Sequence, residues 1–153
     1  MKHTVGMCGV GKWMQRGGKW DVDKFPLCGA PEDASHVYVC TSSGSSMIWD
    51  SSLSVLQAWL DNQNTDTAII LALLQGLREW RGHHDHRPLL QPAQLSVDQQ
   101  TDIGWSLLLE GWLATAQAQQ EYYSIIRSKK SGRKWAHQLI GKLLEIAKAL
   151  WTH

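Results

Sequence analysis

The chain has 153 residues, a formal net charge of +1, and 43% hydrophobic and 19% charged residues. This length fits one domain with a substantial core, and the composition excludes disordered and collagen-like chains. No apolar run reaches the roughly 18–20 residues of a membrane span, and residues 1–6 lack the apolar segment of a signal peptide. Because three Cys are too few for a disulfide scaffold, we expect an intracellular protein of the nucleus or cytoplasm.

The near-zero net charge hides a segregation along the chain. Residues 1–24 carry a balance of +3, residues 25–120 a balance of −7, and residues 121–153 a balance of +5. Two basic ends around an acidic middle fit either a fold that pairs them internally or a fold with an exposed cationic face.

The first third of the chain is predicted to contain little regular structure. Residues 1–24 are rich in Gly, which weakens helices and strands, and residues 25–48 are rich in turn formers. Within the second segment, residues 37–39 form a short β-type run and residues 41–46 a Ser-rich loop. Residues 1–48 are therefore predicted to form a Gly-rich arm and a small, turn-rich lobe that bears Cys and His.

Helical periodicity begins near Asp50 or Ser51, both good N-caps. Leu and Trp residues at three- and four-residue spacing predict a first amphipathic helix, which Asn62 breaks. Thr65 is expected to cap a second helix, and Gly82 is the expected C′ residue at its end.

Two further helical segments follow a Pro-containing loop. A capping box at Ser96 predicts a helix through Leu109, which Gly111 interrupts before the pattern resumes. Ser131 is predicted to cap the final helix. One apolar stripe follows this last helix: Trp135, Leu139, Leu143, Ile146 and Leu150. The helical domain is placed at residues 49–153, in one folding unit with the lobe, and the predicted fold class is mainly α with four to five helices.

Trp is unusually frequent, with nine residues. Most of those in the helical part fall on predicted apolar faces, where core packing explains them best. The alternative is that Trp-rich amphipathic faces pack against a protein partner or a second copy of the chain.

Cys28, His36 and Cys40 follow the spacing C-x7-H-x3-C. Two thiolates and an imidazole are ligands of tetrahedral structural zinc sites. Such sites usually open with C-x2-C, and Phe25 stands at the first of those positions. Cys8, in the Gly-rich arm, is a candidate fourth ligand. The competing interpretation is two buried, reduced cysteines and a surface His without metal.

Five cations fall within eight residues between two predicted helices: Arg127, Lys129, Lys130, Arg133 and Lys134. Cationic side chains next to free N–H groups at a helix start suit phosphate, and Tyr122, Tyr123 and Trp135 are candidates for base stacking. The competing interpretation is a solvated turn that complements the acidic middle.

No nucleophile arrangement of Ser, His and Asp or of Cys and His stands out, so the chain is predicted not to be an enzyme.

Several landmarks occur in a recognisable order: Gly6–Gly11, Lys19-Trp20, Phe25–Gly29, Glu32-Asp33, His36-Val37, Cys40, Trp59-Leu60, Ile103–Trp105, Tyr122-Tyr123 and Ser131–Trp135. With them, the chain resembles the region C-terminal to the polymerase in reverse-transcriptase-like proteins of eukaryotic retroelements. That region carries a zinc knuckle of the C-x2-C-x7-H-x3-C type followed by helices. The polymerase core, with its paired catalytic aspartates, has no counterpart here.

The resemblance implies a zinc-stabilised accessory module that contacts RNA or DNA for a polymerase located elsewhere. Cys28, His36 and Cys40 match the last three knuckle ligands, while Phe25 replaces the first. The expected function is non-catalytic nucleic-acid binding through the basic run and the N-terminal lobe. The alternative is a structural or protein-interaction subunit.

Overall fold

The computed structural model describes residues 28–29, 36–40, 42–82, 98–104, 108 and 115–152. Over these ranges the chain is helical, without strands, and five helices have defined bounds. They are α2 (His36–Val39), α3 (Ser43–Asn62), α4 (Thr67–Trp80), α7 (Ala116–Ile125) and α8 (Gly132–Trp151). The predicted mainly α class with four to five helices is confirmed.

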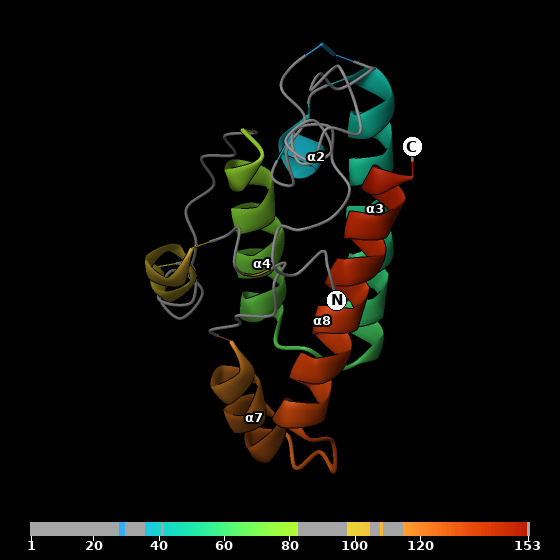
Figure 1. Ribbon diagram of the computed structural model, residues 1–153. Coiled ribbons are helices and arrows are strands. Elements are labelled where there is room, and N and C mark those ends of the chain that lie inside the picture. Colours follow the sequence, from blue (N-terminus) through green and yellow to red (C-terminus); the bar gives the residue numbers. More distant parts are fainter. Residues whose placement is uncertain are drawn as a thin grey trace, which may run out of the picture.

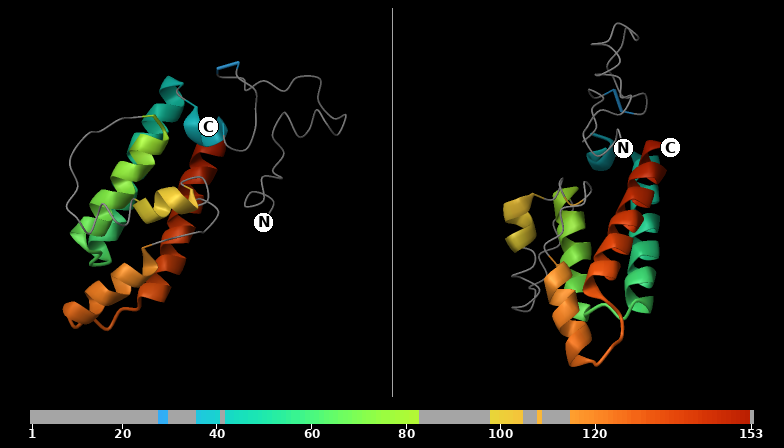
Figure 2. Two further views of the ribbon diagram at one scale, coloured as in Figure 1. Left: turned by 90° about the vertical axis from the view of Figure 1, so that its left-hand side faces the viewer. Right: turned by 60° about the horizontal axis from the view of Figure 1, so that its bottom comes forward.

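Two long helices and α4 form the body of the fold (Figure 1). α3 and α8 each have 20 residues and pack along one another in opposite directions. After a short turn, α4 runs back along α3. α7 packs against the start of α8, and α2 lies near its end (Figure 2). The basic turn between α7 and α8 therefore lies at the same end of the fold as the turn between α3 and α4.

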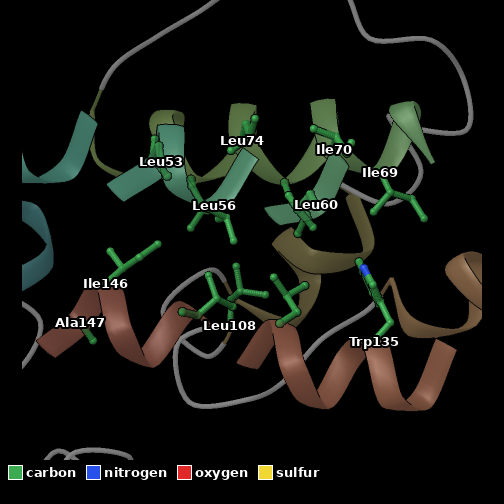
Figure 3. Close-up of a cluster of buried hydrophobic side chains, with 14 of the residues drawn as sticks. Leu53, Leu56, Leu60, Ile69, Ile70, Leu74, Leu108, Trp135, Ile146 and Ala147 are labelled. Carbon is green, nitrogen blue, oxygen red and sulfur yellow. The ribbon is translucent and has the colours of Figure 1, made fainter. Parts of the chain in front are cut away.

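The core lies between α3, α4 and α8, whose apolar side chains face one another (Figure 3). The buried cluster contains Trp49, Leu53, Leu56, Leu60, Ile69, Ile70, Leu73, Leu74, Leu77, Leu108, Tyr123, Trp135, Leu139, Leu143, Ile146, Ala147 and Leu150. The whole predicted stripe of the final helix is buried, which confirms that prediction. Each large apolar side chain in such a cluster contributes about 1.5–3 kcal/mol of transfer free energy.

The described Trp residues belong to the core or pack against it. Trp49 and Trp135 are buried, and Trp59, Trp80 and Trp151 lie against the cluster. Core packing is thus confirmed as their role. The other four Trp residues, at positions 13, 20, 105 and 112, lie outside the described ranges.

The first helix begins earlier than predicted. α3 starts at Ser43, so the Ser-rich segment predicted as a loop over residues 41–46 is helical from Ser43 onward. Ser42 caps the helix, because its Oγ accepts a hydrogen bond from the Ser45 N–H at 3.4 Å. The Ser residues that suggested a loop thus supply an N-cap and the first helical turn. The boundary placed between residues 48 and 49 falls inside this helix.

The β-type run at residues 37–39 is also helical, as part of α2. The Cys40 N–H donates to the His36 carbonyl at 2.8 Å, which closes one helical turn. β propensity is realised only when a neighbouring strand is available. The described residues include no strand that could pair with this run.

The second helix is capped one residue later than predicted. Asp66 is the N-cap of α4, and its Oδ1 accepts from the Ala68 N–H at 3.0 Å. Thr65 is instead buried, with its hydroxyl used elsewhere in the fold. At the other end of the helix, Gly82 has a φ of 97°, so its predicted role as the C′ residue is confirmed.

The third predicted helix is interrupted at Gly104. Residues 98–103 are helical, and Gly104 then takes a φ of 108°. Its N–H donates to the Gln100 carbonyl at 2.8 Å. The left-handed glycine ends this helical segment, and Leu108, within the helix that was predicted through Leu109, is again helical. Ser96 and Gly111, which framed that prediction, lie outside the described residues.

Candidate functional site

The basic run forms the turn between α7 and α8. Just after α7, Arg127 has a φ of 51°. The Ser128 N–H donates a hydrogen bond to the Tyr123 carbonyl at 2.9 Å. This is the Schellman type of helix end. Ser131 caps α8 as predicted, because its Oγ accepts from the Lys134 N–H at 3.4 Å. Hydrogen bonds at both helix ends therefore define the conformation of the turn.

Side chains from the basic end of the chain fasten this turn to the turn between α3 and α4. Lys130 Nζ donates to the Asn62 carbonyl at 3.2 Å. The Tyr123 hydroxyl donates to the Gln63 carbonyl at 2.7 Å. Both acceptors are carbonyls at the end of α3, which have no partner within their own helix. The two turns are thus held against each other.

Two further side chains complete the attachment. The amide of Gln119 bridges the α3–α4 turn, donating to the Asn64 carbonyl at 3.3 Å and accepting from the Asp66 N–H at 3.1 Å. Trp135 Nε1 donates to the Thr65 hydroxyl at 2.9 Å in the interior. Because these groups are buried or partly buried, each bond satisfies a group that would otherwise be desolvated without a partner.

A cavity of about 300 Å³ opens beside the N-terminus of α8. Lys129, Lys130 and Lys134 supply its charge, and the polar residues Gln63 and Gln138 also line it. All three lysines are solvent-exposed. Cations gathered in one concavity attract anions more strongly than the same charges spread over a surface.

Tyr123 and Trp135 also line the cavity, but they belong to the core. Their exposed fractions are 0% and 1%. Burial raises the pKa of Tyr123, and a hydrogen bond with Gln119 opposes that shift. The prediction that Tyr123 and Trp135 stack on bases is therefore wrong, because neither ring face is accessible. Tyr122 is partly buried against the core.

The start of α8 offers fewer free N–H groups than the sequence suggested. The Gly132 N–H donates to Gln120 Oε1 at 2.8 Å, and the Lys134 N–H donates to Ser131 Oγ. The dipole of this 20-residue helix still favours negative charge at its N-terminus. Anion attraction in the cavity consequently rests on lysine side chains and the helix dipole more than on backbone donors.

The structure brings together three of the five predicted basic residues. Lys129, Lys130 and Lys134 line the cavity, whereas Arg127 and Arg133 are exposed outside it. Arg127 occupies the left-handed position at the end of α7. Arg133 precedes Lys134 on α8 and is rotated away by about 100°, as successive helix residues are.

Gln63 and Gln138 were not identified from the sequence. Gln138 lies four residues after Lys134, so both project from one face of α8, a relation that helical spacing makes visible. Gln63 belongs to the distant α3–α4 turn, and its position beside the lysines follows only from tertiary packing.

The second predicted site, the Cys28, His36 and Cys40 group, is also brought together. One ligand atom from each residue lies within 4.8 Å of the others, and Cys28 Sγ is 3.0 Å from His36 Nε2. His36 and Cys40 stand four residues apart on one helical turn. The C-x7-H-x3-C spacing therefore produces a group that could hold a metal ion.

The two cysteines of this group are free thiols in different surroundings. Cys28 is exposed, whereas Cys40 is 1% exposed. Burial alone raises the pKa of the Cys40 thiol, but hydrogen bonds with Ser42 and Cys28 and the charge of Arg81 outweigh it. The pKa of Cys40 therefore lies below its ordinary value. A thiolate is the form that binds metal.

Arg81 joins the Cys/His group to the helical core, a role that the sequence did not reveal. Its Nη2 donates to the Cys40 carbonyl at 2.5 Å and to Ser45 Oγ at 3.0 Å. Its guanidinium lies 4.9 Å from the ring centroid of Trp49. Burial lowers the pKa of Arg81, and the negative charges of Cys40 and Asp50 oppose that shift.

The position of a fourth ligand is not part of this group. Phe25, which stands where a further Cys is expected, lies outside the described residues, as does the candidate ligand Cys8. Two sulfurs and one imidazole nitrogen nevertheless match the donor preferences of zinc. The donor set fits a tetrahedral site with one remaining position.

Comparisons of the chain with protein-family models, curated proteins and solved structures gave no match. None of the described helices combines the length and apolar character needed to cross a bilayer.

Proposed function

We propose that this chain is a non-catalytic nucleic-acid-binding module whose basic turn contacts phosphate groups of RNA or DNA. The observation that carries the proposal is the cavity lined by Lys129, Lys130 and Lys134 at the N-terminus of α8. The resemblance to the region that follows a retroelement reverse transcriptase supports the same proposal and makes the chain an accessory module.

The charge environment supports this function. Among the described residues, no carboxylate forms an ion pair with any of the three lysines; an ion pair is present further along α8, between Lys142 and Glu145 at 2.8 Å. Phosphate contacts by unpaired ammonium groups release counterions from nucleic acid, which drives binding. The solvated-turn interpretation explains the exposure of these lysines but not their convergence on one cavity.

The experiment is a salt titration of binding to short RNA and DNA strands, followed by fluorescence anisotropy. Lys129→Gln/Lys134→Gln should weaken binding and reduce the slope of log K against log salt by about 0.7 for each lost phosphate contact with a single strand. The control Lys142→Gln/Lys148→Gln removes the same net charge from the other part of α8. Absence of binding at low salt, or equal losses in both variants, contradicts the proposal.

We further propose that Cys28, His36 and Cys40 hold zinc as a structural ion. Their converging sulfur and nitrogen atoms support this, with Cys8 as the candidate fourth ligand. Zinc would supply cross-linking of the lobe rather than chemistry. Metal analysis of the folded protein should give close to one equivalent, lost in Cys40→Ala. A folded, reduced protein without zinc after refolding in its presence contradicts the proposal.

The alternative function is a protein-interaction subunit. The described Trp residues do not form the exposed surface that this alternative assumed, because they lie in or against the core. Other apolar side chains are exposed instead, with Met47 at 74% and Ile125 at 78%. Exposed apolar side chains are common on monomeric proteins and do not by themselves indicate a partner, so nucleic-acid binding is the better-supported function.

A further inference from the structure

We infer that the cavity beside α8 binds a terminal phosphate monoester of a nucleic-acid strand in preference to internal phosphodiesters. This inference rests on the proposed nucleic-acid binding and specifies what that site recognises. It follows from the shape of the site, the charge that converges on it, and the way its walls are fixed.

The shape is that of a pocket that accepts a small group. Its volume of about 300 Å³ lies at the lower end of the range of small-molecule sites. A terminal phosphate with its nucleotide can enter such a concavity from one side. An internal phosphodiester must keep its chain on both sides, which limits how far that phosphate can enter the cavity. The concavity therefore favours strand ends.

The charge favours a dianion over a monoanion. A phosphate monoester carries about −1.5 to −2 charges near pH 7, whereas each phosphodiester carries one. Lys129, Lys130 and Lys134 present three cations to the same cavity. The additional negative charge of the terminal group interacts with all three, and the α8 dipole acts in the same direction.

One side of the cavity is held in place before any ligand arrives. Lys130 Nζ is held by the Asn62 carbonyl at 3.2 Å, and the Tyr123 hydroxyl holds the Gln63 carbonyl at 2.7 Å. Gln63 also lines the cavity beside the lysines. Because Lys130 and the α3–α4 turn need not be ordered on binding, their interaction with a phosphate loses less conformational entropy. This side of the cavity is therefore preorganised for an anion.

The test compares strands of one sequence that differ only at their ends, each with an internal fluorophore. The probes carry a 5′-phosphate, a 3′-phosphate or hydroxyls at both ends. The inference predicts at least about tenfold tighter binding for a phosphorylated strand than for the hydroxyl strand. Equal affinity for all three overturns the inference and leaves the proposed function standing. Absence of binding to any strand overturns both.

Lysine variants and a competing nucleoside monophosphate test whether the preference for a terminal phosphate arises in this cavity. Lys134→Gln should remove the preference for the phosphorylated strand, and Lys148→Gln, near the end of α8, should retain it. Circular dichroism identifies a variant that fails to fold, in which case Lys129→Gln replaces it. Preference retained in the folded cavity variants overturns the inference. So does a nucleoside monophosphate that binds as tightly as the phosphorylated strand, because the site then recognises a free nucleotide.

Discussion

Gly132 at the first position of α8 provides a sharp test of the packing between α7 and α8. A Cβ atom placed there would lie 2.7 Å from Gln120 Cβ and 2.8 Å from both the Ala116 carbonyl oxygen and the Gln120 backbone nitrogen. Two of these three atoms belong to the backbone of α7, which cannot move aside as a flexible side chain can. Overpacking of this kind costs about 1–3 kcal/mol. Replacing Gly with Ala gains up to about 1 kcal/mol from helix propensity and the unfolded state.

The expected net effect of Gly132→Ala is therefore a loss of up to about 2 kcal/mol in the free energy of unfolding. Gly141 supplies the matched control, because it lies within the same helix and a Cβ there meets no atom within 4 Å. Gly141→Ala should raise stability by about 0.5–1 kcal/mol. Urea denaturation followed by circular dichroism measures both variants. If the two substitutions shift stability in the same direction, the close approach of α8 to α7 is wrong.

Other contacts make equally specific predictions. Trp135→Phe should lower stability by about 1–3 kcal/mol, because it leaves the buried Thr65 hydroxyl without its donor. Adding Thr65→Val should recover part of that loss in a double-mutant cycle; additive losses would count against the hydrogen bond. Arg81→Met should also lower stability by about 1–3 kcal/mol, since the Cys40 carbonyl and Ser45 hydroxyl lose a charged donor. An unchanged denaturation midpoint for Arg81→Met would show that these contacts do not contribute to the free energy of unfolding.

The spacing of apolar residues predicted most of the fold. The stripe on the final helix was fully predictable because residues three and four apart share one helix face, and only one face of α8 can meet the core. Helix ends depended on weaker local signals. Ser42 caps α3 eight to nine residues before the predicted caps Asp50 and Ser51, and Asp66 caps α4 next to the predicted Thr65. Each of these residue types can cap a helix, and tertiary packing selects among them.

The two candidate sites also differ in how much of their geometry the sequence predicted. The Cys28, His36 and Cys40 group was predictable because its spacing is local and one helical turn joins its last two members. The basic run was predictable as a sequence feature, but its separation into three cavity lysines and two outer arginines was not. That separation depends on the attachment of the turn to α3, which joins residues about 60 positions apart in the sequence.

Arg81 links the described Cys/His group to the helical core. Its single guanidinium contacts the backbone of Cys40, the hydroxyl of Ser45 near the start of α3 and the ring of Trp49 in the core. Burying a cation costs free energy that hydrogen bonds offset, so the contacts with Cys40 and Ser45 stabilise the buried position of Arg81. Any constraint that orders Cys40, including a bound metal ion, therefore also stabilises the end of α4 and the first turns of α3.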